Sequence, residues 1–135
     1  MYGFHEKPGS WLKEEVLISY SIGQVAEKTG LSIHTLRYYE KEGIFPPIKR
    51  DEFGARVFDE EAIEWLRFAC CLRDTGMTIE EMKGFAQLTF QGDQTIPERV
   101  GLLNRQKERV ANQIKQLMNN MSMIEHKLEM YREKL

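Results

Sequence analysis

The stretch from Ser21 to Phe58 constrains the fold of this chain more than any other segment. Two short helical patterns lie on either side of Gly30, with the small residue Ala26 before the glycine and Leu36 after it. A small residue lets two helices cross closely, a glycine permits a tight turn, and an apolar residue anchors the second helix to the first. This spacing predicts a helix-turn-helix that leaves one helix free to enter a major groove of DNA.

Local signals indicate where these two helices begin and end. Ser21-Ile-Gly-Gln24 is a capping box, so we expect the first helix to run from there to about Lys28. Ser32 is placed to cap a second helix over residues 33–42, which Gly43 would end. Both helices are therefore specified by their own residues.

A β-hairpin is predicted after the second helix. Pro46 and Pro47 favour an extended backbone, and residues 49–50 and 55–58 flank a turn with Gly54 at a position that suits positive φ. Asp59 is expected to cap a third helix to about Asp74, and Thr78-Ile-Glu-Glu81 is a capping box for a fourth. The expected fold is mainly α, a winged helix-turn-helix with a helix pair and a long C-terminal helix.

The last segment has apolar residues in steps of three and four, which is the heptad pattern of a coiled coil. Lys107 interrupts the pattern, and Gly92 and Pro97 mark a break before it. The helix would be roughly 55–60 Å long, too long to bury its stripe on so small a domain, so a second copy of the chain is the expected partner. The seam residues are Ile96, Val100, Leu103, Val110, Ile114, Leu117, Met121, Ile124, Leu128, Tyr131 and Leu135. The expected domains are an N-terminal extension (1–19), a winged DNA-binding domain with helix pair (20–92) and a dimerisation helix (93–135).

The outer face of the second helix carries the candidate DNA contacts. Ile33, Leu36 and either Tyr39 or Glu40 have core spacing, which leaves the polar side chains outside. Arginine can bridge guanine O6 and N7, and threonine and tyrosine can reach phosphates or thymine methyl groups. The outward set is His34, Thr35, Arg37, Tyr38 and Lys41, and the hairpin adds Lys49, Arg50 and Arg56. The alternative is that these residues only form a solvated face.

Composition excludes several other kinds of protein. Of 135 residues, 41% are hydrophobic and 30% charged, and the net charge of −2 means that DNA binding needs a local basic face. No apolar run is long enough to cross a membrane, no leader pattern is present, and two adjacent cysteines do not make a disulfide framework, so a reducing cytoplasm is expected. No nucleophile–base pair or phosphate loop indicates an enzyme. No cofactor is expected.

The run from Tyr20 to Phe68, with its LRYYE segment, and the run LRDTGMTIEEMKGF resemble the MerR family of transcription regulators. The resemblance implies an antiparallel coiled-coil homodimer on double-stranded promoter DNA with an overlong spacer. The dimer would distort the DNA so that RNA polymerase can engage both promoter elements. It also implies DNA contacts from Arg37, Tyr38, Tyr39 and Arg56, and from backbone N–H groups at Ser21.

The family's metal sensors carry cysteines around the long helix, whereas this chain has none after Cys71, and its histidines lack ligand spacing. No metal site is therefore expected. The run EWLRFACCLRDTG resembles the subgroup that responds to aldehydes and other electrophiles, which implies a sensing role for Cys71. Arg67 and Arg73 would stabilise its thiolate. Three alternatives stay open, namely a Cys71 that only fills space, a regulator gated by a non-covalent ligand or by none, and a coiled-coil protein that binds a different partner.

Overall fold

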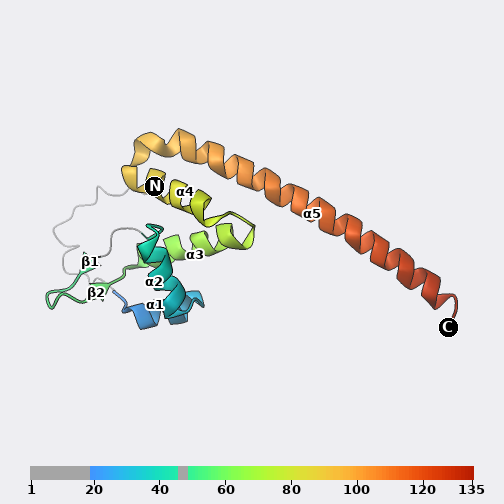
Figure 1. Ribbon diagram of the computed structural model, residues 1–135, viewed down its shortest axis with the longest axis horizontal. Helices are drawn as coiled ribbons and strands as arrows, with labels where there is room; N and C mark the ends of the chain where they lie inside the picture. The colour runs from blue at the N-terminus through green and yellow to red at the C-terminus, as the bar shows by residue number, and fades with distance from the viewer. Residues whose placement is uncertain (1–18, 46–48) are drawn as a thin grey trace, which may run out of the picture. The chain divides into compact units, whose positions relative to one another are not determined.

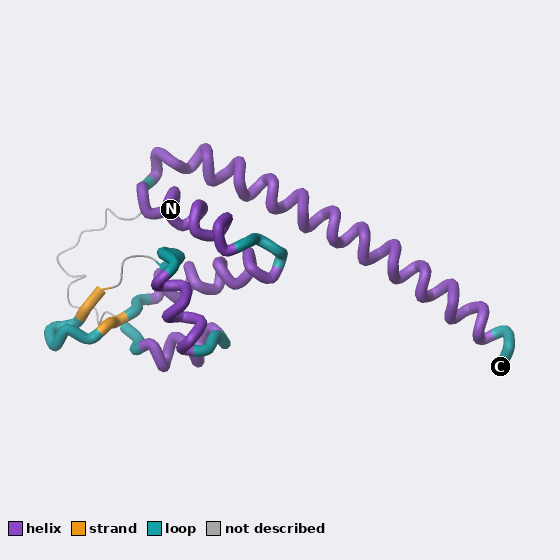
Figure 2. The backbone as a smooth tube through the Cα atoms, viewed as in Figure 1, coloured by secondary structure: helices purple, strands orange, loops and turns teal. Residues whose placement is uncertain are grey.

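The computed structural model describes residues 19–45 and 49–135. Figure 1 shows its elements in chain order, and Figure 2 shows that helices dominate, with one short hairpin. The helices and strands are α1 (Ile22–Thr29), α2 (Ile33–Lys41), β1 (Lys49–Arg50), β2 (Arg56–Val57), α3 (Glu60–Asp74), α4 (Ile79–Gln91), the short 3-10 helix η3 (Asp93–Thr95) and α5 (Ile96–Arg132). Apart from residue 19, the expected N-terminal extension lies outside the described residues, as do Pro46 and Pro47.

The helix-turn-helix forms as its local signals predicted. The Ser21 hydroxyl accepts from the Gln24 N–H while the Gln24 side chain accepts from the Ser21 N–H, which completes the capping box at the start of α1. Gly30 ends the helix in the left-handed region at φ 76°, where its missing Cβ avoids strain. Ser32 caps α2 by accepting from the Thr35 N–H. The turn therefore fixes how α2 leaves α1.

The wing is a two-stranded antiparallel hairpin in which Lys49 pairs with Val57 and Arg50 with Arg56. Its turn is held by the Asp51 carboxylate, which accepts backbone hydrogen bonds from both sides of Gly54. An isolated bridge between Tyr20 and Phe58 extends the pairing to the residue before α1. This bridge ties the base of the wing to the start of the helix-turn-helix.

Apolar side chains from every helix of the first half meet in one core. Val25, Leu36, Ile44, Ile63 and Leu66 have no exposed surface. Burying a side chain of this size contributes about 1.5–3 kcal/mol. The Trp65 indole N–H donates to the Ile44 carbonyl at 2.6 Å, which satisfies a buried acceptor where the chain leaves α2.

The described chain divides into two compact units at Arg67 and Phe68, inside α3. The sequence placed a boundary after residue 92 and grouped α4 with the winged domain. In the structure α4 belongs with α5, because these two helices pack against each other. α3 therefore contributes its first half to one unit and its second half to the other.

The second unit begins with the end of α3, turns at Gly76 and continues into α4. Thr78 and Glu81 complete a capping box at the start of α4, as expected. The rings of Phe68 and Phe85 lie 6.0 Å apart, joining α3 to α4. α5 runs along α4 and then continues beyond it, so its C-terminal part has no neighbour in this unit (Figure 1).

The predicted seam of α5 is largely exposed in the single chain. Ile114 is 53% exposed, Leu117 65% and Ile124 63%. Near its start α5 packs on α4 through a neighbouring stripe, in which Gln106 is buried and Leu102 is half-buried. Two stripes therefore run along one helix, one used within the chain and one still open.

No helix in the described ranges combines the length and the apolar character that crossing a membrane requires.

Candidate functional site

Four of the predicted DNA contacts line one open depression in the first unit. Ser21 comes from the start of α1, Arg37 and Lys41 from α2, and Arg56 from the wing. Ile22, Glu40 and Ala55 complete its lining. The fold thus gathers residues from three elements that are up to 35 positions apart in sequence (21 to 56) around one open depression.

The outer face of α2 matches the expectation at four of five positions. His34, Arg37, Tyr38 and Lys41 are exposed, with Tyr38 at 43%. Thr35 is half-buried, and its hydroxyl accepts from that of Ser32 at 3.0 Å as part of the helix cap. These side chains form the exposed polar face of α2.

Two positions on α2 differ from the expectation. Ile33 was placed in the core, yet it is 38% exposed, because it is the first residue of α2 and the buried residues of the helix begin one turn later at Leu36. Tyr39 was expected in the core from its spacing and at the DNA from the family resemblance. It is 2% exposed and belongs to the core, so it cannot present its ring to a groove, and we remove it from the candidate contacts.

The basic residues of the wing all have partners within the first unit. Arg56 pairs with Glu40, which links the wing to α2. Lys49 pairs with Asp59 at 2.9 Å, and this hydrogen bond raises the pKa of the lysine. Arg50 donates to the Gly54 carbonyl at 2.7 Å. Ser21 also commits its own N–H to Gln24, so it does not offer that group to a phosphate in this state.

The two cysteines of α3 lie in different surroundings. Cys71 is exposed, whereas Cys70 is half-buried, and burial raises the pKa of the Cys70 thiol. The arginines expected to activate Cys71 have other partners. Arg67 donates to the Lys28 carbonyl at 3.4 Å, and Arg73 pairs with Asp74 at 2.9 Å. Accessibility therefore distinguishes Cys71 from its neighbour, and an arginine contact does not.

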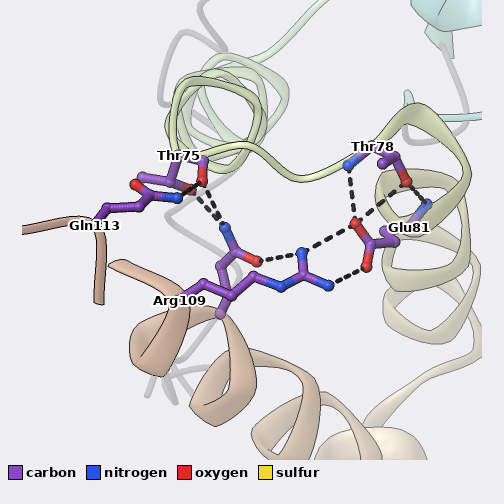
Figure 3. Close-up of polar contacts among 6 residues, drawn as sticks. Thr75, Thr78, Glu81, Arg109 and Gln113 are labelled. Atoms are coloured by element: carbon purple, nitrogen blue, oxygen red, sulfur yellow. Dashed lines mark hydrogen bonds and ion pairs between the residues drawn. The ribbon is translucent and has the colours of Figure 1, made fainter. Parts of the chain in front are cut away.

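A polar cluster fastens α5 to the turn between α3 and α4 (Figure 3). Gln106 donates to the Thr75 hydroxyl at 2.8 Å, and Gln113 donates to the Thr75 carbonyl at 2.7 Å. Arg109 grips both carboxylate oxygens of Glu81, at 3.1 and 2.7 Å. A bidentate arginine–carboxylate pair fixes orientation as well as distance, so the cluster sets the rotation of α5 about its own axis.

Glu81 has two structural roles in this cluster. It caps α4 by accepting from the Thr78 N–H at 2.9 Å, and it holds Arg109 of α5. The hydrogen bond from Arg109 and the one from the Thr78 backbone lower the pKa of Glu81 from 4.5 to about 2. Its charge thus joins the start of one helix to the side of another.

Comparison with known proteins now decides the family. The profile described as "MerR HTH family regulatory protein" matches residues 20–88. The chain belongs to the MerR family of DNA-binding transcription regulators. An HTH-type transcriptional regulator of Haemophilus influenzae is 40% identical over 116 residues, which is 86% of each chain. The regulator AdhR of Bacillus subtilis is 41% identical over 90 residues, 67% of this chain and 64% of that protein.

Solved structures agree with the fold of this MerR-family regulator. One is HiNmlR, a MerR family regulator lacking the sensor domain, bound to promoter DNA, with a TM-score of 0.79 at 40% identity. The match covers 86% of this chain and 92% of the HiNmlR chain. A MerR family regulator from Bacillus thuringiensis has a TM-score of 0.75 at 40% identity, over 82% of this chain and 97% of that one. These proteins are transcription regulators and not enzymes.

Sequence reasoning missed the polar cluster of this MerR-family regulator. Glu81 was identified only as part of a cap, and its partner Arg109 is 28 positions away. A signal was present, because Gln106, Arg109 and Gln113 follow helical spacing immediately beside the heptad seam. Such a polar stripe reads as solvent-exposed unless a second element is known to face it.

The lowered pKa of Glu81 makes a pH prediction. A carboxylate with a depressed folded-state pKa contributes stability above its ordinary pKa and loses it as pH falls toward the folded value. The melting temperature of wild type should exceed that of Glu81→Gln above pH 4.5, and the gap should narrow toward pH 2. Solvent screening of this exposed pair keeps the gap small. Thermal melts at fixed protein concentration measure it, with Glu80→Gln as control, because Glu80 only pairs with Lys83 at 3.8 Å. A gap that does not change with pH would contradict the prediction.

Proposed function

We propose that this MerR-family regulator binds promoter DNA as a homodimer, distorts an overlong spacer for RNA polymerase, and responds to electrophiles through Cys71. The observation that carries the DNA-binding part is the depression that gathers Arg37, Lys41 and Arg56 from α2 and the wing. A regulator of this kind works on chromosomal promoters, so cytoplasmic localisation is part of the proposal.

The chemistry of α2 supports a groove-reading role. Its exposed face combines an arginine, which can pair with guanine, and a tyrosine, whose ring and hydroxyl suit a sugar-phosphate contact. The net charge of −2 gives no general attraction to DNA, so affinity must come from these few cations. Arg56 would have to share its guanidinium between Glu40 and a phosphate.

Replacing Arg37 with alanine should weaken binding to the cognate promoter by roughly tenfold to a hundredfold, or about 1–3 kcal/mol. Lys115→Ala removes a cation from the exposed C-terminal half of α5 and serves as the matched control. Fluorescence anisotropy at several salt concentrations measures both. Equal losses of DNA affinity in the two variants would indicate only a general charge effect. Unchanged binding by Arg37→Ala would show that this residue is not part of the DNA interface.

The exposed seam of α5 supports self-association. A helix of 37 residues that leaves Ile114, Leu117 and Ile124 more than half exposed is poorly stabilised alone, because so much apolar surface stays in water. A heptad seam buries this surface against another helix with the same spacing. The long side chain of Lys107 can tolerate a seam position by extending its ammonium group to solvent.

Replacing Leu117 with glutamate should weaken the dimer by at least about a hundredfold, because each copy loses a buried leucine and gains a seam charge. Met123→Glu is the matched control, since Met123 is 73% exposed but lies off the seam. Sedimentation equilibrium gives both dissociation constants. A monomeric wild type would indicate that the seam binds a different protein. That outcome would favour the competing function, a coiled-coil interaction protein. Equal weakening by both variants would place the interface elsewhere.

The exposure of Cys71 supports a thiol response. An electrophile reaches an exposed thiol directly, and modification would alter α3, the helix shared by both units. Cys70 supplies a natural internal comparison, since it has the same chemistry but is half-buried.

In vitro transcription with and without an aldehyde should show activation by wild type and Cys70→Ser, and none by Cys71→Ser. Mass spectrometry of the treated protein should place the adduct on Cys71. Equal induction of Cys71→Ser and wild type would contradict the proposed thiol response, and the DNA-binding assignment would still stand. The signal would then be a non-covalent ligand or none.

A further inference from the structure

A second pocket lies within the second unit, between α4 and α5. Its volume is about 360 Å³, at the lower end of the range for small-molecule sites. Met77, Phe85, Leu88 and Leu102 give it an apolar wall. The seam residues Leu103 and Lys107 do not line it, so the coiled-coil seam and this pocket use different faces of α5.

Gly84 on α4 faces open space. A Cβ built at this position meets no atom within 4 Å, and the backbone is helical there. A glycine inside a helix lowers helix stability, and packing within this chain gives no reason for it. With no side chain at this helical position and open space beside it, another group has room to approach α4 here.

The charges around the pocket favour an anion. Glu81 is neutralised by Arg109, which holds both of its carboxylate oxygens. Arg105 also lines the pocket and has no hydrogen-bond or ion-pair partner among the described residues. The guanidinium charge of Arg105 is therefore unpaired within the described part of the chain and lies beside the apolar wall of the pocket.

We propose that this pocket binds small monocarboxylates with an apolar aliphatic or aromatic body. Arg105 holds the carboxylate, and the body lies over Gly84 against Phe85 and Leu102. The site does not depend on Cys71, so it goes beyond the thiol response proposed above. A bound molecule would also lie next to Gln106 and Arg109, which fasten α5 to the α3–α4 turn.

The test uses 3-phenylpropanoate and its neutral counterpart 3-phenylpropanamide, titrated calorimetrically into the full-length protein. We expect saturable binding of the carboxylate, at least about tenfold tighter than the amide. Arg105→Gln should bring the two affinities together. No saturable binding of the carboxylate at millimolar concentration, or an amide that binds equally well to wild type, would overturn the proposal.

Gly84 variants test the location of the site. Gly84→Leu should abolish binding, whereas Gly84→Ala, which adds only a methyl group, should bind with less than about a threefold loss. Both should melt no lower than wild type, because each improves helix propensity and the added Cβ meets open space. Unimpaired binding by Gly84→Leu, or a melting temperature below that of wild type, would overturn the proposal. A weaker dimer in Gly84→Leu would also overturn it, because the space would then belong to a second copy. NMR of the Met77 methyl group checks occupancy independently, since a shift with the carboxylate and not the amide is expected.

Discussion

The attachment of α5 to the turn between α3 and α4 is the constraint on which the second unit depends. Gln106 is the one residue of α5, a fully described helix, that is buried. Its hydrogen bonds to Thr75, with those of Gln113 and the Arg109–Glu81 pair, orient the helix. Apolar contacts alone allow a helix to slide or roll, whereas bidentate and buried polar contacts have narrow geometric optima. The direction in which the apolar seam faces follows from this polar attachment.

The first unit holds α2 at its surface while the apolar core of the unit stays buried. The Gly30 turn sets the crossing of α1 and α2, Tyr39 anchors α2 from within, and the Arg56–Glu40 pair links the wing to it. Arg37, Tyr38 and Lys41 are then held on a rigid element. Preorganised side chains lose less conformational entropy on binding than side chains on mobile loops.

Much of this fold could be predicted because its signals are local. Caps at Ser21, Ser32 and Thr78 and the glycine turn at Gly30 each involve residues within a few positions. The long C-terminal helix was also readable, since a single periodicity runs along it. Contacts between residues far apart in sequence could not be predicted in this way. Nothing local separates Tyr38, which is exposed, from Tyr39, which is buried, beyond helical spacing, and family resemblance pointed the wrong way for Tyr39. The partners of Arg56 and Arg109 lie 16 and 28 positions away, so only the folded chain reveals them.

The two stripes of α5 have a consequence for how such regulators diverge. The polar residues that hold the helix to its own unit, Gln106, Arg109 and Gln113, lie on a different stripe from the most exposed seam residues. With the seam as the proposed dimer interface, changes in the outward stripe would alter which chains pair, while the polar attachment of α5 to its own unit would stay the same. A genome encoding several relatives can insulate their assemblies from one another by substitutions at a handful of heptad positions. Pairing specificity and the fold would then depend on different residues of the same helix.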